Sequence, residues 1–407
     1  MLAKGKYGEV IPVRLVNQQV YYIVSVQIAQ AQTPKLLSIP IKHVNNAGSF
    51  IPLISIGIGT PPQSITAVLD TGSSDLIIPR TGSRICQDQQ QQCSGTPFVT
   101  GSFNTDKDSS LKDVGIELNT DFANGAAFRG RFVTTALTLG KQTVSNAQLG
   151  VIEQGSLPAD TPLFPILGIG PVENEVVRPN YQNAPVKLKE AGATDANVYG
   201  VFMNDFRNPE GSIVFGGVDT AKFKGQLQDA GSFLLNNNGV ASKFVINWSS
   251  MQLVGGDSSA PGSNIGLAPR GGLPPVLIDT GNPALNVPSA SLRTIAMAVG
   301  TTFDEQAGQL GSVSCDLGSR GESLSFGFNN NLAKVNTPLA AMLVRDSSSR
   351  GTRCYLPMFS SDGDDFASLG APFMQGAYIV FDLDQKRMLM AEAKMNATGS
   401  SLQPLEV

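Results

Sequence analysis

The 407-residue sequence predicts a mainly β protein built from two similar lobes, and three observations indicate this fold class. Short stretches rich in β-branched and aromatic residues recur between Gly, Pro, Asn or Asp, as at 50–58, 65–69, 211–215, 244–246 and 378–381. The 43 glycines and 25 prolines suit the many tight turns that short strands require. The tripeptide Asp-Thr-Gly occurs twice in similar apolar surroundings. Helical patterns are expected only at 183–191 and 289–299.

The two Asp-Thr-Gly copies belong to a coarse internal repeat. Residues 68–73 read Val-Leu-Asp-Thr-Gly-Ser, and residues 277–282 read Leu-Ile-Asp-Thr-Gly-Asn. After similar intervals, each copy is followed by a hydrophobic-Gly step, at 166–168 and at 368–370. The repeat is too long for a solenoid, so it predicts two lobes that each contribute one copy to a shared centre.

The predicted organisation has four parts. They are an N-terminal extension (1–47), an N-terminal lobe (48–222), a C-terminal lobe (223–394) and a flexible tail (395–407). Length supports two lobes, because single hydrophobic cores stop growing at about 250–300 residues. Within the extension, residues 21–29 are either the core of a secretory signal displaced by an over-extended start or a β-strand, and both interpretations stay open.

Composition excludes several classes of function. The net charge of -4 and the pI near 5.2 give no basic surplus for nucleic acid or for an anionic membrane face. No apolar run reaches 18 residues, so no transmembrane segment is expected. His43 is the single histidine, which excludes zinc sites built on clustered histidines. We therefore expect neither a metal nor a cofactor.

The four cysteines fall into one pair in each half of the chain and form no Cys-x-x-Cys motif. This spacing fits two local disulfides, Cys86–Cys93 and Cys315–Cys354, and hence an oxidising compartment. Four free buried thiols are the alternative. The triplets that begin at Asn247 and Asn396 match the acceptor pattern for N-glycosylation.

The repeated aspartates, Asp70 and Asp279, indicate acid–base chemistry. Each follows an apolar run, and the glycine two residues later lets the backbone turn sharply. Two carboxylates a few Å apart cannot both ionise at low cost, so the pair shares one proton. The ionised member can then act as a general base and the protonated member as a general acid toward one water molecule. The expected supporting residues are Thr71, Gly72, Ser73, Thr280, Gly281 and Asn282.

These motifs resemble those of the pepsin-family aspartic proteases over roughly residues 48–394. The resemblance includes Ile-Gly-Ile-Gly-Thr-Pro-Pro-Gln at 56–63, Asp-Thr-Gly-Ser-Ser-Asp-Leu at 70–76, and the closing strand at 377–382. It implies an all-β, bilobal pepsin-like acid protease fold, with two similar β-barrel-like lobes around a central cleft that holds an extended substrate. Both cysteine pairs also stand where this family commonly has disulfides.

The resemblance implies an aspartic endopeptidase that hydrolyses peptide bonds at acidic pH with water activated between Asp70 and Asp279. Its expected partners are extended peptides or unfolded proteins, without nucleic acid, and the expected state is a monomer that is secreted or vacuolar. Residues 36–42 would be either a pro-segment remnant of a zymogen or the first strand of the mature sheet. The alternative function is a binding module with a pepsin-like fold and weak or absent catalysis.

The sequence departs from the family pattern at the flap, a hairpin that covers the cleft. We expect the flap at 120–125, because Asn124-Gly125 is a strong hairpin-turn signal. Phe122 takes the place of the usual tyrosine, and Ile77 takes the place of a tryptophan that commonly shares its hydrogen bonds. This predicts a more apolar and less tightly anchored flap, with Phe128 as a further residue of the substrate pockets.

The second Asp-Thr-Gly motif also departs from the pattern. Asn282 stands where the family usually has Thr or Ser, whose hydroxyl donates to the catalytic carboxylate. The asparagine amide can donate too, but it is longer and must be placed differently. We therefore expect the surroundings of Asp70 and Asp279 to be unequal.

Overall fold

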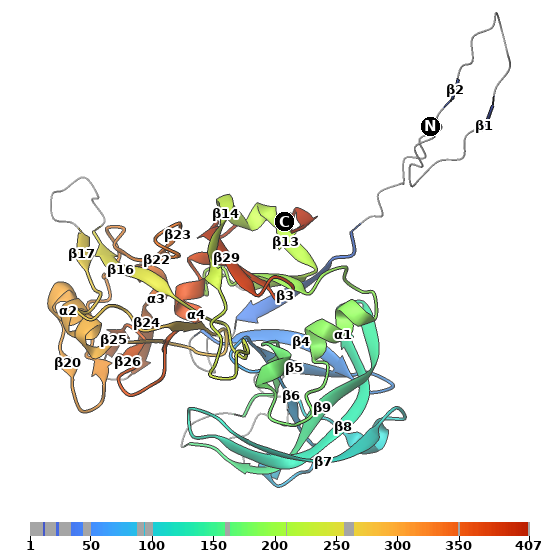
Figure 1. Cartoon of the computed structure of the whole chain (residues 1–407). Helices are drawn as coiled ribbons and strands as arrows, with labels where there is room; N and C mark the ends of the chain where they lie inside the picture. The colour runs from blue at the N-terminus through green and yellow to red at the C-terminus, as the bar shows by residue number, and fades with distance from the viewer. Residues whose placement is uncertain are drawn as a thin grey trace, which may run out of the picture. The chain divides into compact units, whose positions relative to one another are not determined.

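The computed structural model describes residues 11–12, 22–23, 34–43, 50–87, 93, 101–158, 163–208, 210–255, 264–348 and 351–405 (Figure 1). The chain divides into two compact units, Met1–Pro34 and Lys35–Val407. In the first unit, β1 (Ile11–Pro12) pairs antiparallel with β2 (Tyr22–Ile23). The rest of the segment 21–29, which the sequence interpreted as a signal or a strand, lies outside the described residues.

The second unit contains a 13-stranded sheet in the order β14-β29-β28-β11-β12-β3-β4-β5-β10-β6-β9-β8-β7. Most of its strands either alternate between buried and more exposed residues or are apolar throughout, as expected for a sheet covered on one or both faces. The strands are β3 (Leu37–His43), β4 (Pro52–Ile58), β5 (Gln63–Asp70), β6 (Leu76–Pro79), β7 (Lys112–Asp121), β8 (Ala127–Leu139), β9 (Gln142–Ser156), β10 (Ile166–Gly168), β11 (Val198–Phe202), β12 (Glu210–Phe215), β14 (Phe223–Ser232), β28 (Ala377–Asp382) and β29 (Arg387–Ala393).

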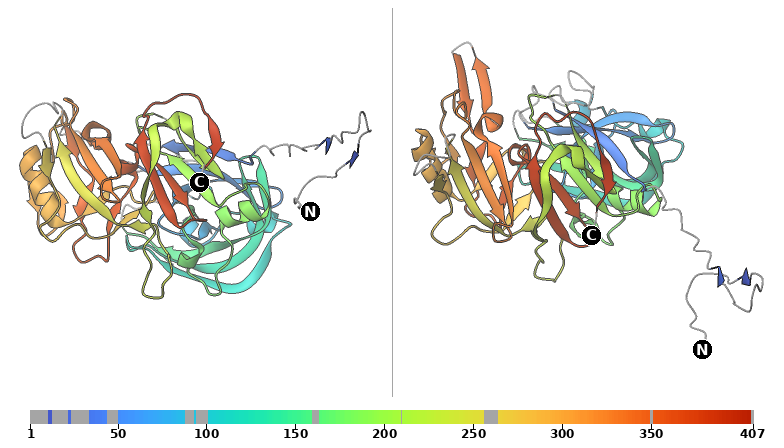
Figure 2. Two further views of the ribbon diagram at one scale, coloured as in Figure 1. Left: turned by 45° about the horizontal axis from the view of Figure 1, so that its top comes forward. Right: turned by 90° about the horizontal axis from the view of Figure 1, so that it is seen from above.

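Strands between residues 245 and 369 form three further sheets. The seven-stranded sheet contains β15 (Val245–Ile246), β18 (Val276–Ile278), β27 (Ala367–Leu369), β19 (Leu285–Val287), β26 (Met358–Ser360), β21 (Gln309–Leu310) and β20 (Phe303–Asp304). The four-stranded sheet contains β17 (Asn264–Gly266), β16 (Trp248–Val254), β22 (Ser323–Phe328) and β23 (Ala333–Pro338), and β24 (Val344–Ser348) pairs with β25 (Gly351–Tyr355). In both views of Figure 2, the red strands near residues 377–393 stand between these yellow and orange strands and the blue to cyan strands.

The sequence repeat appears as a repeated strand arrangement. β10 runs parallel to β5, with Gly168 opposite Asp70. In the other half, β27 runs parallel to β18, with Leu369 opposite Ile278, the residue before Asp279. Each hydrophobic-Gly step therefore lies beside the strand that carries its aspartate. The mainly β fold predicted from the sequence is confirmed.

The helices are short, and two of them lie at the predicted positions. α1 (Ala184–Glu190) follows Asn183 and has Pro185 in its first turn, where a missing N–H costs nothing. α2 (Ser289–Val299) ends at Gly300, whose φ of 72° suits a residue without a Cβ. Two further four-residue helices are α3 (Leu339–Met342) and α4 (Ala371–Met374). No helix among the described residues is long and apolar enough to cross a membrane.

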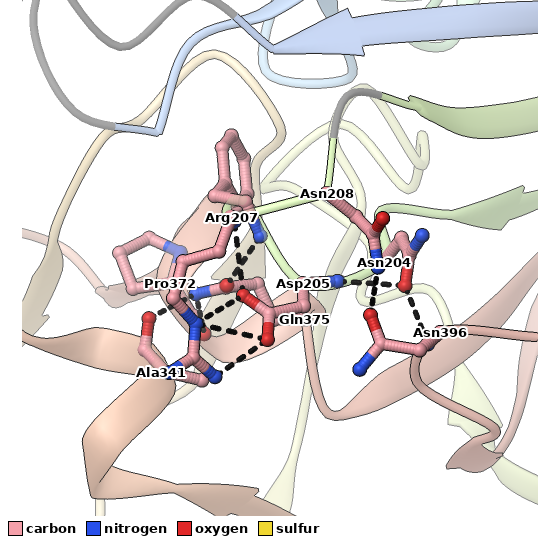
Figure 3. Close-up of polar contacts among 9 residues, drawn as sticks. Asn204, Asp205, Arg207, Asn208, Ala341, Pro372, Gln375 and Asn396 are labelled. Carbon is pink, nitrogen blue, oxygen red and sulfur yellow. Dashed lines mark hydrogen bonds and ion pairs between the residues drawn. The ribbon is translucent and has the colours of Figure 1, made fainter.

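A buried polar network ties the turn after β11 to distant segments (Figure 3). The fully buried side chain of Gln375 accepts from the Phe206 N–H at 3.0 Å and donates to the Ala341 carbonyl at 2.9 Å. Asn204 Oδ1 accepts from the Asn396 N–H at 2.8 Å, which anchors the segment after β29. Since Gln375 is fully buried, its bonds also avoid the cost of unpaired polar atoms.

Both ends of the second unit pair with its sheets. The sequence left two interpretations of residues 36–42, a pro-segment remnant or the first strand of the mature sheet. In the structure β3 lies between β12 and β4, so residues 37–43 form a strand of the large sheet. Near the C-terminus, where the sequence predicted a flexible tail, β30 (Leu402–Pro404) pairs with β13 (Gly217–Asp219). The Ser401 N–H donates to Asp219 Oδ1 at 2.7 Å, so a buried carboxylate holds this segment.

Both predicted disulfides are present. Cys86 bonds to Cys93 and Cys315 bonds to Cys354, with Cα–Cα distances of 5.3 Å and 5.2 Å, which are ordinary for disulfides. All four cysteines are therefore paired, and the alternative of free thiols is wrong. The second bridge closes the longer loop, with a sequence separation of 39 residues against 7.

Candidate active site

Two threonines lock the Asp-Thr-Gly loops against each other. Thr280 Oγ1 donates to the Leu69 carbonyl at 2.5 Å and accepts from the Thr71 N–H at 2.9 Å. Thr71 Oγ1 donates to the Ile278 carbonyl and accepts from the Thr280 N–H, both at 2.9 Å. The four bonds are reciprocal, and both threonines are at most 1% exposed. The loops are thus fixed relative to one another by buried bonds.

Each glycine of the two motifs faces the aspartate of the other motif. A Cβ placed on Gly72 would lie 2.4 Å from Asp279 Oδ2, and a Cβ on Gly281 would lie 2.5 Å from Asp70 Oδ1. No side chain fits at either position, because real Cβ atoms do not approach other atoms this closely. The glycines therefore allow two carboxyl groups to meet at the centre of the site.

The two carboxyl groups have unequal surroundings. Asp70 Oδ1 accepts from the Gly72 N–H at 2.8 Å, and Asp70 Oδ2 accepts from the Ser73 hydroxyl at 2.5 Å. Asp279 Oδ1 accepts from the Gly281 N–H at 2.8 Å. Burial raises the pKa of Asp279 well above its ordinary value, and the neighbouring Asp70 carboxylate raises it further.

Asn282 is oriented away from the carboxylate that it follows. Its Nδ2 donates to Asn286 Oδ1 and to Ser368 Oγ, both at 2.9 Å, which uses both amide hydrogens. Its Oδ1 accepts from the Ala284 N–H at 3.0 Å. The side chain thus stabilises the backbone around residues 282–286. It does not supply Asp279 with the side-chain donor that Ser73 supplies to Asp70.

A hairpin forms where the sequence predicted the flap, and its loop is one residue longer than a two-residue turn. The Phe122 N–H donates to the Ala126 carbonyl at 2.8 Å, and the Gly125 N–H donates to the Phe122 carbonyl at 2.9 Å. Gly125 has a φ of 86°. This is a tight turn followed by a left-handed glycine, a common way to close three-residue hairpins. Asn124 Oδ1 supports it by accepting from the Ala126 N–H at 3.0 Å.

The apolar residues predicted near the flap form one buried cluster beneath the hairpin. Ile77 and Phe128 are 1% and 2% exposed, so both are core residues of this cluster. Phe122 is half-buried and packs edge-on against Phe128, with ring centroids 5.6 Å apart. Of the three, Phe122 is the one with an accessible face.

Three neighbouring residues were missed by the sequence reasoning. Asp75 and Glu175 are 6% and 2% exposed, and Tyr181 donates its hydroxyl to Asp75 Oδ1 at 2.9 Å. Asp75 lies within the first motif, but its partners are about a hundred positions further along the chain. No local pattern marks them, because only the fold brings the two segments together.

The two glycosylation candidates lie on exposed positions. Asn247 is exposed between β15 and β16, and Asn396 is exposed after β29. The Asn396 side chain also accepts a hydrogen bond from Asn208. These triplets stay predictions.

In this β fold two Asp-Thr-Gly loops face each other and bring two carboxyl groups together. This arrangement defines the class of acid proteases that activate a water molecule. Residues 53–393 match the model of the family described as eukaryotic aspartyl protease. The chain therefore belongs to this family, and it is an aspartic-type endopeptidase.

Individual relatives agree with this assignment. The "Probable aspartic-type endopeptidase opsB" of Aspergillus oryzae is 31% identical, with 86% of this chain and 69% of the relative covered. The "Aspartic proteinase yapsin-3" of Saccharomyces cerevisiae is 28% identical over 84% of this chain and 66% of its own. The "Secreted aspartic protease 6" of Candida albicans is 27% identical over 85% and 77%. The crystal structure of the aspartic proteinase from Irpex lacteus shares the fold, with a TM-score of 0.66, 19% identity, and coverage of 90% of this chain and all of that one.

Proposed function

We propose that Asp70 and Asp279 are the catalytic residues and that they hydrolyse peptide bonds with one water molecule held between their carboxyl groups. The observation that carries this proposal is the crossed geometry, in which each motif glycine faces the other motif's aspartate. The pair shares one proton at acidic pH, because two adjacent carboxylates repel each other. No covalent intermediate with the enzyme is required.

Different surroundings support different proposed roles for the two aspartates. Asp70 accepts from two donors, the Gly72 N–H and the Ser73 hydroxyl. The raised pKa of Asp279 keeps the proton on that side chain. Asp70 therefore removes a proton from the water while Asp279 gives its proton to the carbonyl oxygen, and a tetrahedral diol forms. Asp70 then protonates the leaving nitrogen, Asp279 takes back a hydroxyl proton, and the C–N bond breaks.

The proposed substrate is an extended peptide or an unfolded protein strand lying between the dyad and the flap. Phe122 and the hairpin turn at Asn124 and Gly125 would contact it, since they carry the exposed faces of the flap. The division into lobes at residues 222 and 223 is part of this proposal, because each lobe supplies one aspartate. The proposed state is a monomer.

We also propose that the protein acts outside the reducing cytosol, as a secreted or vacuolar enzyme. Two disulfides support this location, since such bonds persist in oxidising compartments. The Candida albicans relative is named as a secreted protease.

The test is hydrolysis of a quenched fluorescent peptide at about pH 4, with Asp70→Asn and Asp279→Asn compared with the wild type. Each substitution removes an acid–base group, so we expect kcat to fall by at least about 100-fold. Asp365→Asn is the matched control, because Asp365 is an exposed carboxylate outside the flap and both Asp-Thr-Gly motifs. Full activity in either dyad variant, or an inactive but folded wild type at every pH between about 3 and 7, would overturn the proposal.

A further inference from the structure

A second pair of acidic side chains is buried beside the first catalytic loop and has no part in the chemistry proposed above. Asp75 follows Asp70 by five residues, and Glu175 lies in the loop of residues 170–181, which connects β10 to α1. Their side chains are almost completely buried, with Asp75 6% and Glu175 2% exposed. Buried carboxyl groups without a metal or a strong ion pair are costly, so their retention calls for an explanation.

The 170–181 loop is bonded to the backbone directly after Asp70. The Gly170 N–H donates to the Ser73 carbonyl at 2.8 Å. The Ser74 hydroxyl donates to the Pro171 carbonyl at 2.6 Å, and Asn174 Nδ2 donates to the Gly72 carbonyl at 3.3 Å. The position of the catalytic loop therefore depends on the shape of the 170–181 loop.

The two acids fix that shape through Tyr181. Asp75 Oδ1 accepts from the Tyr181 hydroxyl at 2.9 Å, and Asp75 Oδ2 accepts from the Val176 N–H at 3.0 Å. Glu175 Oε2 accepts from the Tyr181 N–H at 2.6 Å. Tyr181 is thus held at its backbone by one acid and at its hydroxyl by the other. Its ring packs edge-on against Phe132 in the cluster beneath the flap.

Glu175 is poorly suited to carry a charge in this position. Its Oε1 is buried without a hydrogen-bond partner among the described residues. Burial raises the pKa of Glu175 to about 8, and the nearby Asp75 carboxylate adds to the rise. Burial also raises the pKa of Asp75. An ionised Glu175 would place a second negative charge beside Asp75 in a region with little water.

Few other charged groups face this pair. The guanidinium of Arg178 lowers both pKa values slightly, but it donates to the backbone carbonyls of Glu173, Glu175 and Val177. From α1, Lys187 borders the surface pocket beside Tyr181 and pairs with Glu190 at 3.5 Å. Neither cation forms an ion pair with Glu175 in the part of the chain that the structure describes.

We propose that Asp75 and Glu175 are positioning residues for the Asp70 loop, and that they hold it in place only while Glu175 carries its proton. The proposal rests on the proposed role of Asp70. At acidic pH Glu175 carries its proton, and Glu175 and Asp75 together keep the 170–181 loop bonded to residues 72–75. When the proton leaves, repulsion between the two carboxylates opens the loop and displaces the catalytic loop with it.

Hydrogen–deuterium exchange with mass spectrometry tests the proposal without relying on activity. In the wild type, after correction for the intrinsic exchange rate, protection of residues 72–76 and 170–181 should fall about tenfold or more between about pH 5 and pH 8. In Glu175→Gln it should stay nearly constant, because the side chain cannot ionise. Glu175→Leu serves as a second non-ionisable variant in case the buried amide disturbs folding. Glu173→Gln, an exposed glutamate of the same loop, should behave like the wild type.

Activity supplies an independent measurement. The ratio of kcat/KM for Glu175→Gln to that of the wild type should be near one at about pH 4 and rise several-fold toward pH 8. The titration of the dyad is common to both enzymes and cancels in this ratio. Equal pH dependence of protection in wild type and both Glu175 variants would overturn the proposal. An inactive wild type whose loop still opens in this way would refute only the role of Asp70.

Discussion

The Ser73 hydroxyl donates to Asp70 Oδ2 over 2.5 Å, whereas Asn282, at the equivalent place after Asp279, directs its amide to Asn286 and Ser368. The two halves of the dyad thus share their backbone geometry but differ in one side-chain donor. A donor to a carboxylate favours its ionised form. The missing donor therefore helps to leave the proton on Asp279.

Replacing Asn282 by serine should make the dyad more symmetric. A hydroxyl that donates to Asp279 lowers the pKa of that carboxyl, so the high-pH limb of the kcat/KM profile should move toward acid by about half a unit or more. The loss of the bonds to Asn286 and Ser368 should also cost about 1 kcal/mol of stability. Asn286→Ser is the control, because it removes one hydrogen-bond partner of the Asn282 amide without placing a donor near Asp279. Identical pH profiles for Asn282→Ser and the wild type would refute the assigned role.

Replacing either crossed threonine by valine should damage both stability and catalysis. Thr280→Val leaves the Leu69 carbonyl and the Thr71 N–H buried without their partner, which should cost about 2–5 kcal/mol in urea unfolding. We expect kcat to fall more than KM rises, because the carboxyl groups shift relative to each other. Thr337→Val provides the comparison: this fully buried threonine donates to the Phe373 carbonyl, outside the site. It should lose stability at unchanged kcat.

Adding a hydroxyl to the flap should change little. Phe122 packs against Phe128, and the position that would supply a partner is occupied by the buried Ile77. Phe122→Tyr should therefore keep kcat/KM within about twofold of the wild type. Phe122→Ala should raise KM, since it removes the exposed aromatic face. A tenfold gain from the tyrosine would show that the flap hydroxyl finds another partner.

His43 should make the fold less stable in acid. Burial lowers the pKa of His43 to about 4, while the Met203 carbonyl and the charge of Asp205 oppose this shift in part. The unfolded chain binds the proton more tightly, so stability is present near pH 6.5 and declines as pH falls toward 4, by up to about 3 kcal/mol. Urea unfolding at both pH values should give a smaller difference for His43→Gln than for the wild type. An equal difference would mean that His43 does not carry this pH dependence.

The sequence alone determined the fold class, the pair of aspartates and both disulfides. These features are local or repeated: β-branched runs, turn residues and the two Asp-Thr-Gly motifs are legible without long-range information. The helix at Ser289–Val299 was predictable for the same reason, because Pro288 and Gly300 border an apolar periodic stretch. The hairpin turn at Asn124-Gly125 was located correctly, although its loop is one residue longer than these two residues alone suggest.

Only the tertiary structure decided how the neighbours of these residues are used. The sequence shows that Asn282 can donate, but the direction of its amide depends on Ser368, which the fold brings beside it. Phe128 and Ile77 looked like pocket residues and proved to be core, since burial depends on which strands stack above them. Asp75 belongs to the first motif, but no local pattern connects it with Glu175. Their shared burial arises because β10 returns beside β5 and brings the 170–181 loop over residues 72–75.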